Sequence, residues 1–397
     1  MPALKRPAAG HATTAQGSAS SSKRSRTSIG SADEYEEISC IGEGGFGVVL
    51  KALHRATGKT VAIKYLSPPD GTAEPPDAAV ADLLQEARFL ETCSSGNPHV
   101  VGFEGLVRHP STGELGLAME YVPAPTLHKF LWGRRCGPPL TESMVRAFMW
   151  KLLTGAKTMH DRHVVHRDIK PKNILVGQGG ELVKICDLGL AMSLSELPPY
   201  AQAGTLDYMA PEMLLQKQDY DAQVDAWSLG CVMGELITGR TLFPDLQDDD
   251  DQAEDEFIDE VLKLDSIFRV LGTPDEKTWP GFTSLPLTAK AMQMLPARRN
   301  KRNRLREIFP EEKLSEQGLE VLQGLLTCNP DKRLTAAKAL KLPWFAVHRP
   351  APAAAAKVDA PVYLLRKKAP RIKFISSAIQ EKITFKIPLA VWNAQRV

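Results

Sequence analysis

The sequence predicts an α+β fold in which a small β-rich lobe precedes a larger helical lobe, and three observations support this. Apolar, β-branched runs typical of strands, VVLKAL, VAIKYL and LGLAMEYV, all lie before residue 123. Beyond them, apolar residues recur at helical spacing in Val145, Phe148, Leu152, Ala156 and Met159. The run VDAWSLGCVMGELITGR at 224–240 is apolar on nearly every face, which predicts a buried helix that ends at Gly239.

The small lobe combines strands with one helix. Residues 35–66 contain two strand patterns, separated by the turn ATGK with its Gly58. The Pro- and Gly-rich loop LSPPDGTAEPP follows. Residues 78–92 then show helical spacing, with one apolar face made by Val80, Leu83, Leu84, Ala87 and Leu90. We therefore expect one helix among the strands of this lobe.

The composition is that of an ordinary globular chain. Of the 397 residues, 43% are hydrophobic and 24% are charged, and the formal net charge is +2. So small a charge provides no global field, and we expect neither direct nucleic-acid binding nor membrane association. The longest apolar stretch, around 224–239, is interrupted by Asp225 and Glu235, which disfavours a membrane span.

The cysteines and histidines form no recognisable metal-binding pattern. Six scattered cysteines without a C-x-x-C pair disfavour a disulfide framework or a zinc site and fit a reducing compartment. His160, His163 and His166 recur at every third residue, so metal ligation is one interpretation. Ordinary histidines are favoured, because no Cys or carboxylate cluster accompanies them at ligand spacing.

Both ends of the chain have the composition of tails. Residues 1–34 are rich in Ala, Ser and Thr, and we expect them to be disordered. Their basic clusters, Lys5-Arg6 and Lys23-Arg24-Ser25-Arg26, predict nuclear localisation. An organelle transit peptide and a solvated tail on a cytoplasmic protein are the alternatives. Residues 347–397 are expected to form a linker and a basic C-terminal extension.

An acidic run, DLQDDDDQAEDEFIDE, covers residues 245–260. Like most charge runs it is interpreted as a solvated loop. Electrostatic attraction of a basic substrate is the second interpretation.

The first chemical motif is GEGGFGVV at 42–49, which lies between two predicted strands. Gly42, Gly44 and Gly47 omit side chains where a backbone must approach phosphates closely. A G-x-G-x-x-G pattern alone is a weak signal, and an ordinary Gly-rich hairpin is the alternative. A Rossmann dinucleotide site is disfavoured because a strand follows, not a helix.

Two charged residues of the small lobe are candidates for holding phosphates. Lys64, in the strand VAIK, can neutralise α- and β-phosphates, and Glu86 on the predicted helix can hold the lysine in place. Taken singly, each is as easily a solvated surface charge.

The run VVHRDIKPKNILV at 164–176 is far more specific. Asp168 can accept a proton from an attacking hydroxyl, and Lys170 can steady the transferring phosphoryl group. Asn173 can ligate Mg²⁺, and Asp187 in KICDLGL offers a further hard oxygen ligand. Apolar pairs on both sides of the loop would hold these polar groups at a fixed spacing.

Together these motifs resemble those of the eukaryotic protein kinases, in the family's order and over residues 35–345. APE at 210–212 and DAWSLG at 225–230 match as well, and Arg333 matches the late Arg that pairs with Glu212. HRD followed by Ile-Lys-Pro is similar to the Ser/Thr class. The resemblance implies a bilobal protein kinase domain at 35–346, with an N-lobe over about 35–119 and a C-lobe over about 123–346.

The resemblance also implies an enzyme that transfers the γ-phosphoryl group of ATP to Ser or Thr hydroxyls of a protein substrate, with Mg²⁺ as the second cofactor. A pseudokinase scaffold is the alternative, and it is disfavoured because every group that the chemistry needs is present. Narrower roles are a kinase of the C-terminal repeats of RNA polymerase and a kinase that activates cyclin-dependent kinases. No residue selects between these two.

The resemblance places an ATP site between the lobes. Met119 is expected at the back of the adenine pocket, while Glu120 and Val122 offer backbone hydrogen bonds. Cys186 is expected to be a packed and inert thiol in the same pocket. The expected ATP-binding residues are Ile41, Gly42, Glu43, Gly44, Gly45, Phe46, Gly47, Val48, Val49, Ala62, Lys64, Met119, Glu120, Val122 and Leu175, of which Ala62 and Leu175 enclose the ring.

Within the family, the chain is most similar to the cyclin-dependent kinases and is placed near plant members of the F type. The glycine loop, VDAWSLGCVMGEL and LDSIFRVLGTPDEKTWPGFTSLP carry this resemblance. A cyclin-like partner stays open, because the helix AAVADLLQEARFL lacks a PSTAIRE-like signature. Gly45 and Phe46 stand where the family often has Thr and Tyr, which excludes inhibitory phosphorylation at these positions.

The activation segment ends in PPYAQAGTLDYMAPE at 198–212. Tyr200 aligns with the activating Thr of the cyclin-dependent kinases. Of three arginines that would receive its phosphate only Arg167 remains, because Gln85 and Met192 replace the others. We therefore expect activity without phosphorylation of this segment. A phosphorylated Tyr200 and an ordinary loop tyrosine are the alternatives.

The end of the same segment bears on substrate choice. Thr205 matches the Thr that contacts Asp168 and Lys170 in the family, so Ser/Thr transfer is expected. Asp207 and Met209 replace the family's Trp and Arg, so we expect no strict preference for Pro after the target residue.

Overall fold

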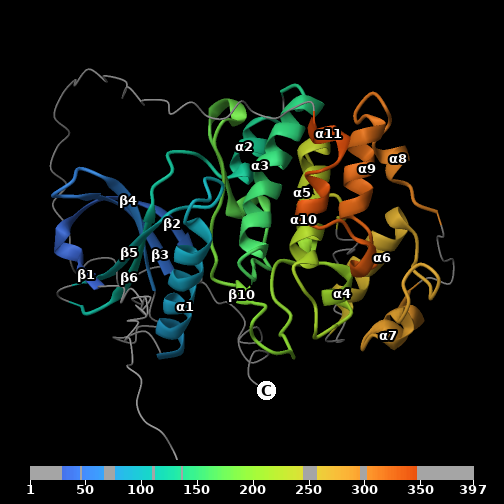
Figure 1. Ribbon diagram of the computed structural model, residues 1–397, viewed down its shortest axis with the longest axis horizontal. Helices are drawn as coiled ribbons and strands as arrows, with labels where there is room; N and C mark the ends of the chain where they lie inside the picture. The colour runs from blue at the N-terminus through green and yellow to red at the C-terminus, as the bar shows by residue number, and fades with distance from the viewer. Residues whose placement is uncertain are drawn as a thin grey trace, which may run out of the picture. The chain divides into compact units, whose positions relative to one another are not determined.

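The computed structural model describes residues 29–44, 47–66, 77–109, 112–135, 137–244, 257–295 and 302–346. They form a lobe built on one β-sheet and a lobe built mainly of helices (Figure 1). This is the α+β arrangement that the sequence predicts. The basic clusters of the N-terminal tail, the C-terminal extension, the acidic run up to residue 256, and Gly45 and Phe46 lie outside the described residues.

The sheet of the small lobe has six strands in the order β1-β5-β6-β4-β3-β2. Neighbouring strands pair antiparallel, except for the parallel pair β1 and β5. The strands are β1 (Ile29–Ser31), β2 (Tyr35–Gly44), β3 (Gly47–His54), β4 (Thr60–Tyr65), β5 (Phe103–Arg108) and β6 (Leu115–Glu120).

Residues 29–34 differ from the sequence-based expectation of a disordered tail. They form β1 and the 3-10 helix η1 (Ala32–Glu34). Ile29 is largely exposed, so burial of apolar side chains does not explain this order. The backbone of β1 pairs with Leu106, Val107 and Arg108 of β5, and composition carries no signal for such pairing.

Helix α1 (Asp77–Ser94) is the helix predicted over 78–92, and it packs against the sheet (Figure 1). Leu83, Ala87 and Leu90 are buried and join the apolar cluster that includes Leu117 of β6. Glu86 is buried as well. A buried carboxylate is costly without a partner, so its position already implies a cation nearby.

The helical lobe is organised around α3 and α5. Its helices are α2 (Leu127–Gly133), α3 (Glu142–His160), α4 (Pro211–Leu214), α5 (Gln223–Thr238), α6 (Ile258–Leu271), α7 (Thr288–Met294), α8 (Leu305–Ile308), α9 (Glu316–Leu325), α10 (Ala336–Ala339) and α11 (Pro343–Ala346). Short strands pair as β7 (Val164–Val165) with β10 (Met192–Ser193) and as β8 (Ile174–Val176) with β9 (Val183–Ile185). The 3-10 helices are η3 (Pro171–Asn173), η4 (Gln178–Gly180), η5 (Leu206–Tyr208), η6 (Phe282–Ser284) and η7 (Pro330–Lys332).

Local sequence explains both central helices. Thr141 caps α3 by accepting a hydrogen bond from the Met144 N–H, and the whole predicted apolar stripe of α3 is buried. Helix α5 is buried over nearly its whole length, as predicted. Gly239 ends it with a left-handed φ of 72°, a conformation that glycine adopts without strain.

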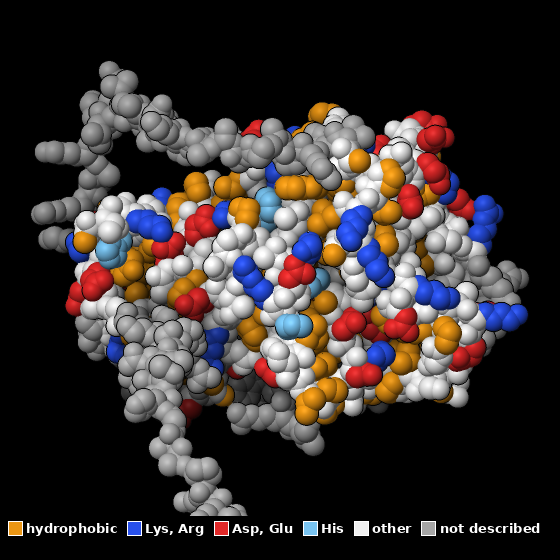
Figure 2. Space-filling model, in the orientation of Figure 1, with side chains coloured by type: hydrophobic (Ala, Val, Ile, Leu, Met, Phe, Trp, Pro, Cys, Tyr) orange, Lys and Arg blue, Asp and Glu red, His pale blue; other side chains and the backbone are white. Residues whose placement is uncertain are grey.

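The described surface carries charges of both signs. Acidic and basic side chains are interspersed on the face shown in Figure 2. Among the described residues, every helix is too short or too polar to cross a membrane.

Candidate active site

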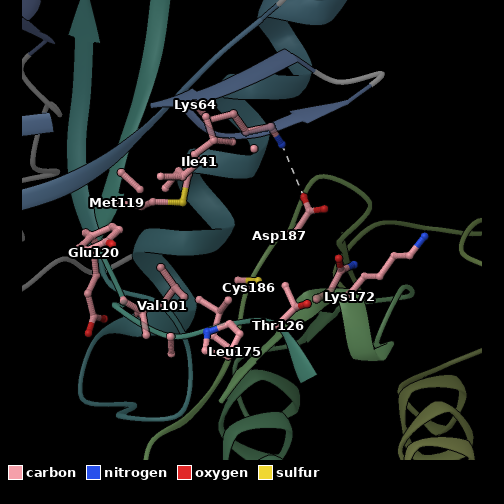
Figure 3. Close-up of a pocket in the computed structure, with 18 of the residues that line it drawn as sticks. Ile41, Lys64, Val101, Met119, Glu120, Thr126, Lys172, Leu175, Cys186 and Asp187 are labelled. Atoms are coloured by element: carbon pink, nitrogen blue, oxygen red, sulfur yellow. Dashed lines mark ion pairs between the residues drawn. The ribbon is translucent and has the colours of Figure 1, made fainter. Parts of the chain in front are cut away.

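A cavity of 580 Å³ lies between the sheet and the helical lobe. The alternation of side chains along β4 explains one wall, because Val61, Ile63 and Tyr65 pack into a cluster on the other side of the strand. Ala62 and Lys64 therefore face the cavity. Figure 3 shows Ile41 and Met119 on the sheet side of the cavity, Leu175 and Cys186 on the opposite side, and Lys64 facing Asp187 at one end.

Most of the described residues expected to bind ATP line this cavity. They are Ile41, Gly42, Glu43, Gly47, Val49, Ala62, Lys64, Met119, Glu120, Val122 and Leu175. Gly44 and Val48 do not line it. Sequence reasoning missed Val101, Tyr121, Ala124, Pro125, Thr126, Lys129 and Lys172. Most of these directly follow the strand of Met119 and Glu120, and that proximity was the available signal.

The glycine loop is a hairpin whose geometry demands glycine at one position. Gly47 has a φ of 125°, and a Cβ there would lie 1.9 Å from the Tyr65 carbonyl oxygen. Gly44 and Gly47 pair across the antiparallel strands β2 and β3. An antiparallel hairpin here is thus compatible with glycines that let the backbone approach phosphates closely.

At the end of β6, where an adenine ring is expected, two backbone N–H groups are already hydrogen-bonded within the protein. The Glu120 N–H donates to the Gly102 carbonyl at 2.8 Å, and the Ala124 N–H donates to the Val122 carbonyl at 2.8 Å. Glu120 can therefore offer an adenine ring only its carbonyl oxygen. Burial, together with Asp187 and Glu86, raises the pKa of the Cys186 thiol to about 12, so this sulfur is a neutral thiol at physiological pH.

Lys64 and Glu86 meet inside the cavity. The Lys64 Nζ lies 2.8 Å from Glu86 Oε2 and 3.5 Å from Asp187 Oδ1. Burial opposes the charge of Lys64, yet the two carboxylates hold the pKa of the ammonium above its ordinary value. Burial raises the pKa of Glu86 in turn, which opposes its ionisation. With two carboxylates facing one ammonium, Lys64 is the group that stays charged.

The catalytic-loop residues converge on the Asp168 carboxylate. The Thr205 hydroxyl donates to Asp168 Oδ1 at 2.7 Å, and the Lys170 Nζ lies 2.8 Å from Oδ2 and donates to Thr205 at 2.6 Å. Asn173 donates to the Asp168 carbonyl and to Oδ2 at 2.9 and 3.0 Å. These contacts orient the carboxylate. Oδ1 accepts one of these hydrogen bonds and Oδ2 two, so Oδ1 keeps a lone pair that can accept from a substrate hydroxyl.

A buried aspartate that sequence reasoning did not assign holds this loop in shape. Asp225 of α5 is fully buried and accepts hydrogen bonds at 2.9 Å from the backbone N–H groups of His166 and Arg167. Arg167 has a left-handed φ of 66°, which these bonds help to stabilise. Burial disfavours ionised Asp225, but the bond from His160 and the charges nearby hold its pKa below the ordinary value. An acidic residue inside an otherwise apolar helix was the available signal.

The three regularly spaced histidines have separate surroundings. His160 bonds to Asp225 at 2.8 Å, while His166 bonds to the Cys186 carbonyl and accepts from the Asp168 N–H. Among the described residues, no group of three or more His, Cys, Asp and Glu side chains could hold a metal ion. The favoured interpretation of ordinary histidines therefore agrees with the structure.

Asn173 and Asp187 line the same cavity and fit a Mg²⁺ ion that brings other ligands with it. The Asn173 amide nitrogen is engaged by Asp168, so its carbonyl oxygen is the atom left to face a cation. The Asp187 side chain is 41% exposed, and the distance of 3.5 Å from its Oδ1 to the Lys64 Nζ is long for an ion pair. Two hard oxygen donors suit a cation that takes its remaining ligands from phosphates and water.

Arg167 holds the activation segment through hydrogen bonds to uncharged acceptors. Arg167 donates to the carbonyls of Leu190 and Ala201 and to the Tyr220 hydroxyl, at 2.6, 3.3 and 3.0 Å. The Tyr200 hydroxyl donates to the Glu196 carbonyl at 2.7 Å, and the Tyr200 ring packs against that of Tyr220.

Gln85 and Met192, which stand where two phosphate-binding arginines are expected, carry no charge. Gln85 is exposed on α1, and Met192 is buried in β10. Gly204 has a φ of 118°, and a Cβ there would lie 2.4 Å from the Arg167 carbonyl oxygen. Only glycine fits at this point, so the segment passes directly over the catalytic loop.

Glu212, at the end of the segment, forms a fully buried pair with Arg333. Two parallel hydrogen bonds of 2.6 and 2.7 Å join the carboxylate to the guanidinium. The resemblance to the protein kinases implies this pair, and the two side chains are in contact in the structure.

Comparisons with known proteins agree with this geometry. The family model described as "Protein kinase domain" matches residues 35–345. A putative cyclin-dependent kinase F-2 of Oryza sativa subsp. japonica is 42% identical over 319 residues, which cover 79% of this chain and 90% of the relative. Cyclin-dependent kinase G-2 of Oryza sativa subsp. indica is 37% identical over 323 residues, 79% of this chain but 42% of the relative.

A third relative, cyclin-dependent kinase G1 of Arabidopsis thaliana, is 35% identical over 324 residues, 79% of this chain and 49% of the relative. The chain thus spans less than half the length of the two relatives of the G type. The cavity, the Lys64–Glu86 pair and the Asp168 cluster occur in a chain that the family model matches over most of its length. The chain is therefore a member of the protein kinase family, a Ser/Thr protein kinase similar to the plant cyclin-dependent kinases.

Proposed function

We propose that the chain phosphorylates Ser and Thr hydroxyls of protein substrates in a magnesium-dependent reaction, with Asp168 as the group that receives the hydroxyl proton. The observation that carries this proposal is the Asp168 carboxylate fixed by Thr205, Lys170 and Asn173, beside a cavity in which the Lys64–Glu86 pair is already formed. A Mg²⁺-ATP complex would supply the phosphoryl group and shield its charge.

Each residue then has a task that its contacts support. Lys64 offers a permanent positive charge to phosphate oxygens, and Glu86 fixes its position. Lys170 places a second ammonium beside Asp168, where it would stabilise the negative charge of the phosphoryl group during transfer. Thr205 ties the activation segment to the same carboxylate, so a substrate bound along that segment is positioned against the base.

The same contacts disfavour a pseudokinase scaffold. A scaffold needs the fold but not the charged groups, whereas here the six groups expected to act, Lys64, Glu86, Asp168, Lys170, Asn173 and Asp187, lie together at one end of the cavity and the adjoining loop. The preserved arrangement supports catalysis.

The partner of this site is a protein substrate, and a cyclin-like partner is proposed as optional. The support is that α1 already places Glu86 against Lys64 without a second chain. Strict Pro direction is not proposed, because Met209 is buried and carries no charge to shape the pocket after the acceptor.

The Asp168→Asn variant tests the catalytic proposal. Its turnover should fall by about 10²–10⁴-fold, the usual worth of a general base. ATP affinity should be unchanged within experimental error, because Asp168 does not line the nucleotide cavity. Transfer of labelled phosphate to a protein substrate, followed by phosphoamino-acid analysis, measures the first effect, and chelation of Mg²⁺ should abolish transfer reversibly.

Asp161→Asn is the matched control, since Asp161 is an exposed aspartate that pairs with Lys157. It should retain full activity. Equal labelling by Asp168→Asn and the parent chain, or label on tyrosine alone, would contradict the proposal.

We further propose nuclear localisation, which rests only on the clusters Lys5-Arg6 and Lys23-Arg24-Ser25-Arg26. A fluorescent fusion of the full chain should concentrate in the nucleus, and alanine at these basic positions should abolish this accumulation. Exclusion of both forms from the nucleus would contradict nuclear localisation.

A further inference from the structure

We propose that a second cavity beside the catalytic loop is a substrate subsite for an anionic side chain, a carboxylate or a phosphorylated residue, next to the acceptor hydroxyl. The inference deepens the proposed kinase function and depends on it. The cavity has a volume of 620 Å³, and Lys170 and Thr205 are among the residues that line it. Both contact Asp168, so a peptide segment in this cavity lies within reach of the reacting atoms.

Four cationic or titratable side chains line the cavity in addition to Lys170: His128, Arg135, Lys172 and Arg240. They come from α2 and its end, from η3 and from the end of α5, so three separate segments deliver them to one hollow. All four are exposed. Within the described parts of the chain, none of them forms an ion pair with a carboxylate. The charges of Arg135, Lys172 and Arg240 are therefore available to a ligand.

Lys172 also borders the nucleotide cavity, and Figure 3 shows its side chain extending away from Leu175 and Cys186. Its backbone belongs to the catalytic loop between Lys170 and Asn173. The ammonium thus extends from the catalytic loop on the side away from the adenine wall. A substrate bound along this loop would meet it directly.

The two acidic residues of the cavity are already engaged. Asp207 Oδ1 lies 2.6 Å from the buried ammonium of Lys263, and Glu235 Oε2 accepts from the Tyr208 hydroxyl at 2.6 Å. Burial raises the pKa of Glu235, which further reduces its capacity to bind a cation. The charge of Asp207 is thus paired with Lys263 and Glu235 is buried, whereas the cationic side chains are exposed to the hollow. This favours an anionic ligand over a basic one.

Arg135 is held in place for such a contact. Its guanidinium lies 3.5 Å from the centre of the Trp132 ring, and the residue Trp132 is 58% exposed. Stacking on an aromatic face fixes the plane of a guanidinium while its N–H groups stay free for a carboxylate or phosphate. Arg135 and Arg240 also line an adjoining hollow of 430 Å³ together with Arg134, so the positive surface continues past the first cavity.

This charge preference is opposite to the attraction of basic substrates that the acidic run at 245–260 suggested. The run up to residue 256 lies outside the described residues, and none of these residues lines the cavity as described.

The test uses the purified full chain and a set of peptides with one Ser acceptor in a neutral background. Each flanking position is occupied in turn by Ala, Glu, phosphoserine or Lys. We expect Glu or phosphoserine at one fixed position to raise kcat/KM by about tenfold over Ala, the effect of one charge-assisted contact, and Lys to lower it. Comparison of the Glu and phosphoserine peptides shows which anion the subsite prefers.

The double variant Arg135→Glu/Arg240→Glu identifies the cavity. It should abolish the preference for the acidic peptide or invert it toward Lys, while ATP affinity confirms that the variant is folded. Lys313→Glu makes the same charge reversal at an exposed lysine outside the cavity and should retain the parent preference. Raising the salt concentration from about 0.05 M to about 0.5 M should weaken the preference in the parent chain, because exposed charges are screened.

The outcomes separate the two proposals. No labelling of any peptide or protein substrate would refute the proposed function itself. Labelling without an acidic preference, a preference for Lys, or an acidic preference that survives in the double variant would overturn the subsite while leaving the kinase activity intact.

Discussion

Arg167 shows how a single side chain can order an activation segment without a phosphate. Its guanidinium has three acceptors, and all are neutral: two backbone carbonyls and the Tyr220 hydroxyl. Burial raises the pKa of Tyr220, so the hydroxyl stays protonated and donates in turn to the Ala201 carbonyl at 2.5 Å. A charged arginine satisfied in this way needs no anion to hold the segment in place.

We therefore predict that Tyr200→Phe keeps its activity. The ring still packs against Tyr220, and only one hydrogen bond to the Glu196 carbonyl is lost, so activity should change by less than about fivefold, equivalent to about 1 kcal/mol. Kinetic assays of the variant and of phosphatase-treated parent chain measure this.

Tyr220→Phe is the informative comparison, because it removes both the bond from Arg167 and the bond to Ala201, and it should lose more activity. Stoichiometric phosphate on Tyr200 of the active chain, together with an inactive Tyr200→Phe, would refute this account.

Helix α1 is attached to both lobes. Glu86 connects it to Lys64 of the sheet, and Arg162 connects its C-terminal end to the helical lobe. The Arg162 guanidinium donates to the carbonyls of Thr92, Cys93 and Ser95 at 2.6, 3.0 and 2.5 Å. These carbonyls belong to the last turn of α1 and the residue after it, where the helix has no partners of its own for them. Arg162 thus limits the outward motion that would separate Glu86 from Lys64.

Arg162→Ala should release this restraint. We expect kcat/KM to fall about five- to thirtyfold, the effect of one or two hydrogen bonds worth about 1 kcal/mol each. Hydrogen exchange should increase in residues 77–94 but not in α3.

Arg108→Ala is a matched control, because this exposed arginine also donates to a backbone carbonyl, that of Gly113, away from α1. Reduced activity with unchanged exchange in α1 would contradict the proposed restraint.

At the scale of the whole molecule, Glu142 joins three distant parts of the helical lobe. Its carboxylate, at the start of α3, accepts from the Ser315 hydroxyl at 2.6 Å and from the Ser315 N–H at 3.1 Å. It also accepts from the Trp344 indole N–H at 2.5 Å. Partial burial opposes ionisation, but these donors hold the pKa of Glu142 below its ordinary value of 4.5. The ionised form is therefore the one that stabilises the fold.

This pKa shift predicts how stability depends on pH. A carboxyl group with a lowered pKa in the folded state contributes stability that is complete above pH 4.5 and is lost as the pH falls through the folded value. Glu142→Gln should lower the free energy of unfolding by about 1–2 kcal/mol at neutral pH, the usual worth of such bonds. The difference from the parent chain should shrink on acidification.

Urea unfolding at several pH values measures this. A deficit that stayed constant down to acidic pH would show that the carboxylate charge has no part in the effect.

The site residues that the sequence located lie in short contiguous motifs. Asp168, Lys170 and Asn173 stand within six residues of one another, and Lys64 and Asp187 lie in equally short patterns. The ordered set of these motifs, which resembles that of the protein kinases, identified them. Glu86 needed the helical period of α1 as well, because only that period places it on the buried face.

The missed residues act through partners far away in the sequence. Asp225 bonds to the backbone 58 and 59 residues earlier, Arg162 to carbonyls about 70 residues earlier, and Glu142 to a serine 173 residues later. No local period encodes such pairs, because they arise only when packed elements bring them together. The cationic cavity was missed for the same reason. Arg135 follows α2 and Arg240 follows α5, so the two arginines are far apart in the sequence.

The buried pair of Glu212 and Arg333 has a consequence for the connectivity of the molecule. It clamps together two points that are 121 residues apart, with both side chains almost fully removed from water. Removal of either partner would leave an uncompensated charge in the protein interior, which is strongly destabilising. The pair thus makes the position of the end of the activation segment depend on residues near the end of the helical lobe.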